Sequence, residues 1–551
     1  MKSPEPINRF YNTPVLRHYG QNNREEIPWK PVFEKPCSFP SQIFLETMQD
    51  MILNPNYNTS WILRADILFD SHRAGNVAEE LASCSLDGEA SSEPGTHVSA
   101  RHIEMRGFSA ARRLVRKFVP RNPERDRTAN QTCIFFEEDS APEGLWKKKT
   151  LVVYLAHVSA VEELPYYLPA VKAVAFLHEE NVLETENQNK ISIHYLHFEP
   201  SASLTTRLER TALRLIERII KVGNGAVNGY EKRVYHDIVI PRERSQDTYL
   251  KLRLRHAPRL MARWVEKTDP KKHVFEDILI AAFLIELWGD MYGPGAVAGP
   301  HGRVEFPGFV DIGCGNGVLV DILLKEGYKG YGFDARKRMT WSTFDKETQE
   351  GLFEMVLIPW MLIDEMEEAG LVGEQEGRFG GFLSEGGSMP GIHDGKFGQG
   401  TFIISNHADE LTGWTPLLAK VAHSPFLIIP CCSHDLSGFK HRHKSTKTTN
   451  EPVVQSNVGK IERATRIGTV SSEYASLVAW VTSIAEDVGY VVEREVLRIP
   501  STRNIGLIGR VCNDSELSVE NILEREGGGI GWAQKALALR KTQLQPQKNR
   551  C

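Results

Sequence analysis

The stretch Phe309-Val-Asp-Ile-Gly-Cys-Gly-Asn-Gly-Val318 decides the fold of this chain. Its first four residues are typical of a short buried strand, and a helical apolar pattern follows over 317–326. Gly313, Gly315 and Gly317 permit backbone conformations that residues with a Cβ seldom adopt, so the chain can turn tightly and approach a ligand closely. The helix that follows presents unpaired N–H donors. The stretch therefore predicts a strand, a loop and a helix that bind a nucleoside-containing cofactor.

The spacing of these glycines separates two classes of cofactor. A dinucleotide-binding loop has the pattern G-x-G-x-x-G and would require glycine or alanine at position 318, where this chain has Val318. The pattern here is D-x-G-x-G-x-G, opened by Asp311, and Asp334 ends the next strand-like run 17 residues after Gly317. This context favours a nucleoside site over NAD binding or a glycine turn without a ligand.

The segments around the loop alternate between short apolar strands and helices. Further strands are expected at 330–334, 401–405 and 426–430, and further helices at 411–421 and 471–487. Such alternation is typical of a doubly wound parallel sheet. Two last runs, 491–499 and 504–512, are separated by Pro-Ser-Thr-Arg and are expected to pair antiparallel. The predicted fold class is α/β, a Rossmann-like sheet that ends in an antiparallel hairpin.

The first half of the chain has a different pattern. Strand-like runs at 151–157, 171–177 and 191–198 precede an amphipathic helix over about 205–222, which indicates an α+β region. We divide the chain into an accessory region, a second domain and a C-terminal tail, over 1–224, 225–515 and 516–551. Disordered insertions are expected where glycine-rich or polar composition prevails, near 75–105, 370–400 and 440–460.

The composition excludes several classes of protein. The 551 residues are 41% hydrophobic and 25% charged, with a net charge of −5, unlike collagen-like, disulfide-scaffold or disordered chains. The longest apolar stretch, 278–288, is shorter than the ~20 residues that span a bilayer and predicts a buried helix. No signal-peptide pattern opens the chain, and its eight cysteines lack C-x-x-C spacing. We therefore expect an intracellular protein with reduced thiols and no membrane association.

Ligands of an open parallel sheet bind beyond the carboxyl ends of its strands. The residues that follow 405 and 430 should therefore face the reacting group, and the candidates for a base or an orienting group are Asp409, Glu410, His434 and Lys440. The pair Cys431 and Cys432 could suggest zinc, but adjacent cysteines lack the usual two-residue spacing, so we expect no metal.

A basic stretch precedes the glycine loop. Ten lysines and arginines and four acids lie between 242 and 272, a local net charge of +6 in a chain that is slightly acidic overall. Phosphate contacts from such side chains give salt-dependent binding to RNA. The residues expected to bind RNA are Arg242, Arg253, Arg255, Arg259 and Arg263. A solvated helix face is the alternative interpretation.

The loop pattern resembles the first motif of class I S-adenosylmethionine-dependent methyltransferases. That resemblance assigns Asp334 to the ribose hydroxyls of the cofactor and Asp311 to the loop and the methionine end. The residues expected at the cofactor are Asp311, Gly313, Gly315, Gly317, Asp334 and Asn406.

Longer blocks resemble a narrower family, the tRNA (uracil-2′-O-)-methyltransferases that act on uridine 44. These blocks are Asn406-His-Ala-Asp-Glu-Leu-Thr-Gly-Trp-Thr-Pro416, Ile429-Pro-Cys-Cys-Ser-His434, Arg498-Ile-Pro-Ser-Thr-Arg-Asn504 and the run from His273 to Trp288. The resemblance implies a cytoplasmic enzyme that methylates the ribose of uridine 44, chiefly in serine tRNA, and it leaves a protein partner open. The alternatives are an inactive subunit that binds RNA or stabilises a partner, and transfer to another acceptor.

Overall fold

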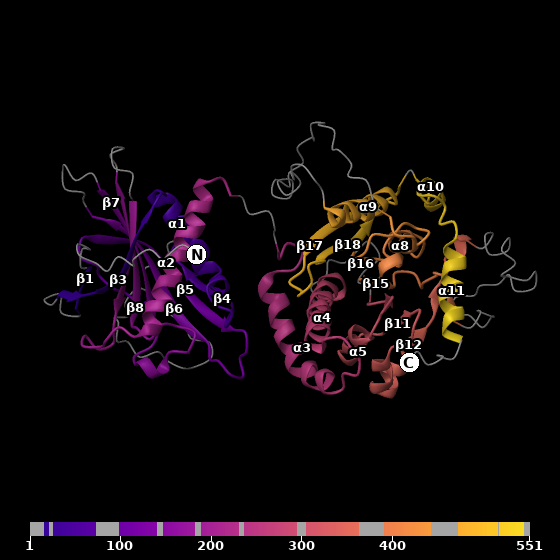
Figure 1. Cartoon of the computed structure of the whole chain (residues 1–551), viewed down its shortest axis with the longest axis horizontal. Coiled ribbons are helices and arrows are strands. Elements are labelled where there is room, and N and C mark those ends of the chain that lie inside the picture. Colours follow the sequence, from indigo (N-terminus) through magenta and orange to yellow (C-terminus); the bar gives the residue numbers. More distant parts are fainter. Residues whose placement is uncertain are drawn as a thin grey trace, which may run out of the picture. The chain divides into compact units, whose positions relative to one another are not determined.

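The computed structural model of the chain describes residues 16–20, 26–72, 99–139, 147–181, 189–230, 236–294, 305–362, 391–441, 472–515 and 517–544. Two units are distinguished, Met1–Glu231 and Lys232–Cys551 (Figure 1). The expected division at 224/225 falls inside the last turn of helix α2 (Thr206–Val227). In the part of the chain described, no helix is both long and apolar enough to cross a membrane.

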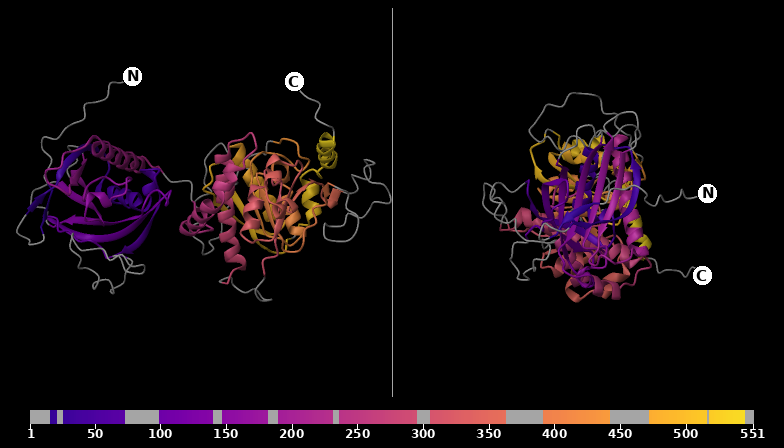
Figure 2. Two further views of the ribbon diagram at one scale, coloured as in Figure 1. Left: turned by 90° about the horizontal axis from the view of Figure 1, so that it is seen from below. Right: turned by 90° about the vertical axis from the view of Figure 1, so that its left-hand side faces the viewer.

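The first unit is built on an antiparallel sheet of seven strands in the order β3-β9-β8-β7-β6-β5-β4. The strands are β3 (Lys30–Cys37), β4 (Ile62–Asp70), β5 (Phe108–Pro120), β6 (Ala129–Glu138), β7 (Lys147–Ala156), β8 (Ala173–Asn181) and β9 (Asn189–Leu196). Helices α1 (Ser41–Leu53) and α2 pack on one face, and Figure 2 shows the sheet curving beside α2. The α+β prediction, with β7, β8, β9 and α2 near their expected positions, is confirmed.

Strand β5 was not predicted from the sequence, because its charged residues obscure the strand pattern. β5 carries four basic residues, yet Arg116 is buried and its guanidinium donates to Gln131 Oε1 and to the carbonyl of Ile52. Its cation also lies 4.5 Å from the ring centroid of Phe118. Because a buried cation needs such partners, Arg116 serves the core of this unit.

The second unit contains a mixed sheet in the order β12-β11-β10-β15-β16-β18-β17. Its parallel strands are β10 (Phe309–Ile312), β11 (Gly330–Asp334), β12 (Leu352–Glu354), β15 (Phe402–Asn406) and β16 (Phe426–Ile429). β17 (Tyr490–Val496) and β18 (Ile505–Cys512) are antiparallel to each other, and β18 is antiparallel to β16. The predicted α/β class and the terminal antiparallel pair are confirmed.

Strand residues alternate between two helix layers. Phe309, Phe402 and Leu427 face a core shared with α3 (Arg242–Ala262), α4 (Pro270–Tyr292) and α5 (Val318–Lys325). Val310 and Ile403 face the opposite core, which includes α8 (Thr415–Val421) and α9 (Glu473–Asp487). Because successive strand residues point to opposite faces, a fully apolar strand is buried on both sides. The expected buried helix over 278–288 lies within α4.

The segment after 515, expected to be a tail, contributes to this second core. α10 (Val519–Arg525) buries Ile522, and α11 (Trp532–Leu544) buries Trp532, whose indole N–H donates to the carbonyl of Leu357 at 3.0 Å. These apolar side chains hold the helices against the α/β fold.

Most of each expected insertion lies outside the described residues, but its edges do not. Ile103 is buried in the first unit, and β14 (Ile392–His393) pairs with β13 (Val356–Leu357) in the second. Residues 99–105 and 391–400 therefore belong to the ordered fold, since their side chains fill its cores.

An ion pair joins α3 to α5. Arg259 Nη2 lies 2.6 Å from Oδ2 of Asp321, whose side chain is fully buried, and Thr348 Oγ1 donates to the other oxygen at 3.1 Å. The neighbouring Arg255 and His256 both contact Glu326. Part of the positive charge of α3 is thus neutralised within the fold.

Arg259→Ala should lower the free energy of unfolding by about 3 kcal/mol, because it leaves the Asp321 carboxylate buried without its counter-charge. Arg263→Ala, at the exposed end of the same helix, should change it by less than about 0.5 kcal/mol. Urea unfolding of the full chain measures both variants. Equal effects would show that Asp321 does not depend on Arg259.

Candidate active site

A cavity of about 740 Å³ lies at the carboxyl ends of β10, β11, β15 and β16. Its wall includes the glycine loop after β10, the end of β11 and residues 406–411 after β15. Residues of α4 and α11 complete it. The cavity therefore occupies the place where an open parallel sheet binds its ligands.

All three glycines of the loop have left-handed backbone conformations, with φ of 73° at Gly313, 51° at Gly315 and 76° at Gly317. A Cβ at Gly317 would lie 2.9 Å from Leu352, whereas a Cβ at Gly315 would meet no protein atom within 4 Å. Gly317 is thus required by packing, and Gly315 leaves space open to the cavity. The side chain of Asn316 accepts from the N–H of Val318, the first residue of α5, and so satisfies one of the free donors at the start of the helix.

Asp334 fixes the loop from the neighbouring strand. Its Oδ2 accepts from the N–H of Gly315 at 3.0 Å, and its Oδ1 accepts from the N–H of Arg336 at 2.9 Å. The indole N–H of Trp341 donates to the carbonyl of Gly315 on the other side. A carboxylate has further acceptor positions beyond these two, so Asp334 can still accept from a ligand hydroxyl.

Two carboxyl groups lie deep in this cavity. Asp277 on α4 and Asp311 on β10 are each less than a tenth exposed. Burial, with Glu276 beside it, raises the pKa of Asp277 to about 8, although Asn316 and Asn406 act in the opposite direction. Burial and the nearby Asp277 and Asp334 raise the pKa of Asp311 well above its usual range. In this site the two carboxyl groups keep their protons, and a bound cation would stabilise their ionised forms.

Buried polar atoms in the cavity also lack partners. Among the described residues, Oδ1 of Asp311, Oδ1 of Asn406 and Nδ1 of His407 have no hydrogen-bond partner. Buried polar groups are seldom left so, because each costs free energy unless it is paired. All three residues line the same cavity, which indicates that a polar ligand completes their hydrogen bonds.

The segment after β15 is held in an unusual conformation. His407 and Asp409 have positive φ, 53° and 43°, which non-glycine residues seldom adopt. His407 Nε2 lies 3.3 Å from Oε1 of Glu276, and the Nδ2 of Asn406 donates to Asp277 at 3.5 Å. These contacts tie the segment to α4 and turn Asp409 toward the cavity.

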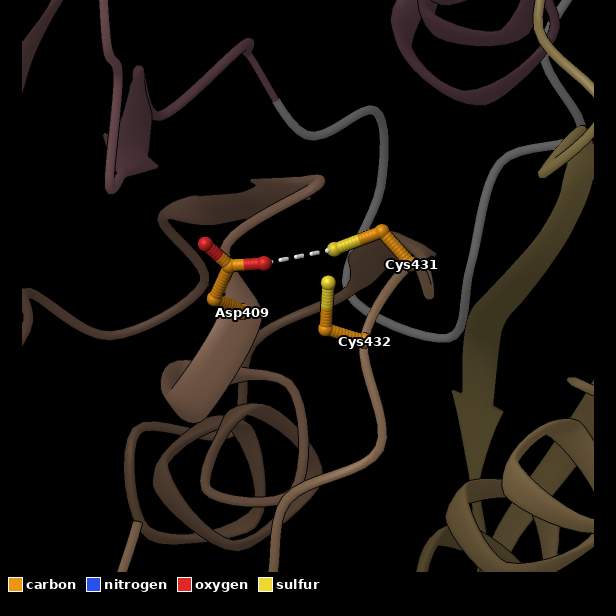
Figure 3. A group of neighbouring side chains, drawn as sticks. All are labelled: Asp409, Cys431 and Cys432. Carbon is orange, nitrogen blue, oxygen red and sulfur yellow. Dashed lines mark hydrogen bonds between the residues drawn. The ribbon is translucent and has the colours of Figure 1, made fainter. Parts of the chain in front are cut away.

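Asp409 also meets the two cysteines that follow β16. Cys431 Sγ donates to Asp409 Oδ1 at 3.0 Å, and Figure 3 shows the sulfur of Cys432 beside that of Cys431, on the side of the carboxylate. Burial, reinforced by Asp409, raises the pKa of both thiols. Free of a bound cation, the two cysteines are therefore thiols at neutral pH and not nucleophiles.

A second cavity of about 340 Å³ adjoins the first, and the two share Cys431 and Arg503. Its wall includes Lys440 and Tyr474, and the Arg503 guanidinium lies 4.5 Å from the ring centroid of Tyr474. A stacked cation and ring form a surface suited to a planar ligand.

The predicted site residues are distributed over these two cavities. The six expected at the cofactor line the larger cavity, except Gly317, which packs behind it. Asp409 and Glu410 line the larger cavity, Lys440 lines the smaller one, and His434, which pairs with Lys440, lines neither. Glu410 Oε1 lies 3.3 Å from Nζ of Lys535 on α11.

The basic stretch becomes α3 and the start of α4. Arg255 and Arg259 are ion-paired within the fold, whereas Arg253 lies 5.5 Å from the ring centroid of Phe275 and Arg263 is exposed. Arg242 begins the helix. Lys272, ten residues beyond α3, lines the larger cavity, so the basic surface reaches the site.

Several residues of the site carry no motif in the sequence. Glu276 and Asp277 lie in the run 273–288 that carries part of the family resemblance, but no role was predicted for them, and Trp532 and Leu539 lie in the expected tail. The acidic pair inside an otherwise apolar run was the one available signal. Trp341 and Trp414 are both buried in the cores of the second unit.

Two family models match the chain. One is described as a TRM44-like, N-terminal bet v1-like domain and matches residues 9–233, and the other is described as a predicted AdoMet-dependent methyltransferase and matches 239–359. Proteins called tRNA (uracil-O(2)-)-methyltransferase are 41% identical in Neurospora crassa, over 96% of both chains, and 35% identical in Schizosaccharomyces pombe, also over 96% of both. The Saccharomyces cerevisiae protein of that description is 35% identical over 92% of this chain and 91% of its own.

The raised pKa of Asp277 makes a pH-dependent prediction for the ligand-free chain. The folded carboxyl holds its proton up to about pH 8, whereas an unfolded one loses it near pH 4, so its ionisation costs stability increasingly between these values. The melting temperature of Asp277→Asn relative to the unsubstituted chain should therefore rise by a few °C from pH 4 to pH 8.

Asp345→Asn is the control for that measurement. A hydrogen bond from Lys325 lowers the pKa of Asp345 to about 2, so this group is ionised in the folded chain throughout the range and in both states above about pH 5. Its melting-temperature difference should stay constant from about pH 5 to pH 8 in differential scanning calorimetry. A constant difference for Asp277→Asn as well would contradict the assignment.

Proposed function

The chain belongs to the tRNA (uracil-O(2)-)-methyltransferase family, and we propose that it transfers a methyl group from S-adenosylmethionine to the ribose 2′-oxygen of uridine 44 in tRNA, chiefly serine tRNA. In this proposal the second unit carries the chemistry as a Rossmann-like, class I methyltransferase domain beginning near residue 225. The first, over 1–224, is an accessory region. The cytoplasm is its proposed compartment, in keeping with the free thiols of the six described cysteines.

The larger cavity fits the proposed cofactor. S-adenosylmethionine is cationic at its sulfonium and ammonium groups. Its positive charge would let the buried carboxyl groups of Asp277 and Asp311, which keep their protons in the ligand-free chain, ionise as its counter-charges. The open space at Gly315 admits a close approach to the backbone, and Asp334 retains acceptor positions for ribose hydroxyls. When bound, the cofactor supplies an electrophilic methyl group. This match of charge is the observation that carries the proposal.

The smaller cavity is proposed to receive the target nucleoside. Tyr474 and Arg503 form a stacking surface for a flipped base, and Lys440 on the same wall offers a donor to its polar edge or to a phosphate. Cys431 and Arg503 belong to both walls, so an acceptor placed there reaches the boundary of the cofactor cavity. Holding the two reactants in this way contributes ~7 kcal/mol or more to catalysis.

A ribose hydroxyl is a very weak acid, so the enzyme must help to remove its proton. Asp409 is the carboxylate that lies at the boundary of the two cavities, next to Cys431. Glu410 is paired with Lys535, and His434 lies outside both walls. Lys440 lines only the smaller cavity, where we propose that it donates to the base or a phosphate, so we assign Asp409 to the acceptor hydroxyl. A group in this role contributes roughly 10²- to 10⁴-fold to the rate.

The methyl-transfer reaction tests the function directly. Labelled S-adenosylmethionine and tRNA that lacks this modification should yield 2′-O-methyluridine at position 44 on nucleoside analysis. Gly315→Ala should reduce transfer at least 10-fold, because its Cβ would project into the cofactor space. Gly327→Ala, also at a positive φ (87°) but outside the cavity wall, should keep the activity. A methylated base would identify another acceptor, and no transfer would indicate an inactive subunit.

The basic stretch at α3 is proposed to bind the tRNA backbone. Arg253→Ala combined with Arg263→Ala should weaken tRNA binding and reduce its salt dependence by about one unit of slope for each phosphate that is no longer neutralised. Lys346→Ala, a highly exposed lysine elsewhere in the second unit, is the control. A filter-binding titration across salt concentrations measures this. Unchanged slopes would remove α3 from the RNA-binding surface.

A further inference from the structure

Three side chains with metal-binding atoms gather at the boundary of the two cavities. One carboxylate oxygen of Asp409 and the thiol sulfurs of Cys431 and Cys432 all lie within 4.8 Å of one another. Figure 3 shows both sulfur atoms on the side of the carboxylate. Ligands of a tetrahedral zinc ion stand about 3.6–3.8 Å apart, so small side-chain rotations would suffice to bind one.

The chain brings these groups together from two strand ends. Asp409 follows β15, whereas the cysteines follow β16, the adjacent parallel strand. Within a strand, neighbouring side chains point to opposite faces. The cysteines lie beyond the last residue of β16, so this alternation does not apply to them. Adjacent cysteines can thus act as a pair here, which sequence spacing alone argued against.

The position of the cluster distinguishes it from an incidental contact. Asp409 and Cys431 belong to the wall of the larger cavity, and Cys431 and Cys432 to the wall of the smaller one. Asp409 and Cys432 are exposed and Cys431 is partly exposed, so a cation among them would also be open to a ligand. Structural zinc sites are closed by four protein ligands, whereas sites with three leave one position for a water or a substrate.

We propose that Asp409, Cys431 and Cys432 bind one Zn²⁺ ion, and that its fourth position takes the ribose hydroxyl of the target nucleotide. The two thiolates select zinc over magnesium or calcium, which prefer oxygen ligands. This inference rests on the proposed function for the identity of the acceptor. It departs from the expectation that no metal is needed.

The chemistry balances without a further reactant. On binding, Zn²⁺ replaces the protons of both thiols, which pass to the solvent, and Asp409 binds as its carboxylate. The hydroxyl then takes the open position, where the cation lowers its pKa and its proton leaves to water. In this mechanism Asp409 acts on the hydroxyl through the ion and not as a direct base. The oxygen forms a bond to the methyl carbon while the bond from that carbon to sulfur breaks, and the electron pair of that bond stays on sulfur.

Cobalt titration tests the site independently of activity. Metal-free full chain titrated with Co²⁺ should develop thiolate-to-cobalt absorption that saturates at one ion per chain and disappears when Zn²⁺ is added. Cys432→Ser should weaken Co²⁺ binding at least 10-fold. Cys512→Ser, an exposed cysteine outside both cavity walls, should bind as the unsubstituted chain does. Absence of the band, or its persistence in Cys432→Ser, would overturn the site.

Methyl transfer then tests the role of the ion. Cys432→Ser should lower transfer at least 100-fold while calorimetry shows S-adenosylmethionine binding unchanged, since Cys432 lines only the smaller cavity. Full activity in the metal-free chain would overturn the catalytic part of the proposal. If the unsubstituted chain shows the cobalt band but methylates no tRNA, the proposed function fails while the metal site stands.

Discussion

The second unit buries carboxyl groups at the carboxyl ends of its central strands, and this burial determines what kind of ligand the site can bind. Asp311 belongs to β10, Asp277 faces it from α4, and Asp334 ends the adjacent strand. Groups of one charge in a poorly solvated space either keep their protons or acquire a cation. No lysine or arginine is among the groups that act on Asp277 and Asp311, so these carboxyl groups keep their protons unless a cationic ligand stabilises their ionised forms.

The same constraint explains the shape of the loop. A cationic ligand close to Asp311 requires a backbone without side chains in its path, and the left-handed glycines provide one. Asp334 and Trp341 hold the loop from opposite sides, so its conformation exists before any ligand binds. The strained His407 and Asp409 define the far side of the same space.

The parts of the fold that could be predicted are those whose signal lies within a short stretch of sequence. The glycine loop, the parallel strands and the antiparallel pair follow from residues that are close in sequence. Strand β5 escaped prediction because its arginines suggest an exposed surface, although the core around Phe118 accommodates Arg116. In the site, Asp277 and Trp532 could not be assigned, since each acts through contacts with residues far away in the sequence. The ion pairs of Arg255 and Arg259 were hidden for the same reason.

The placement of α11 has a consequence for synthesis of the protein. The wall of the larger cavity extends in sequence from Glu266 to Leu539. At roughly 5–20 residues per second, translation takes on the order of tens of seconds to pass from the first of these residues to the last. During that interval the acidic groups of Asp277 and Asp311 have been made, but the helix that closes their cavity has not. The nascent chain thus carries an unfinished cleft on the ribosome, and the cofactor site becomes complete only after α11 has emerged.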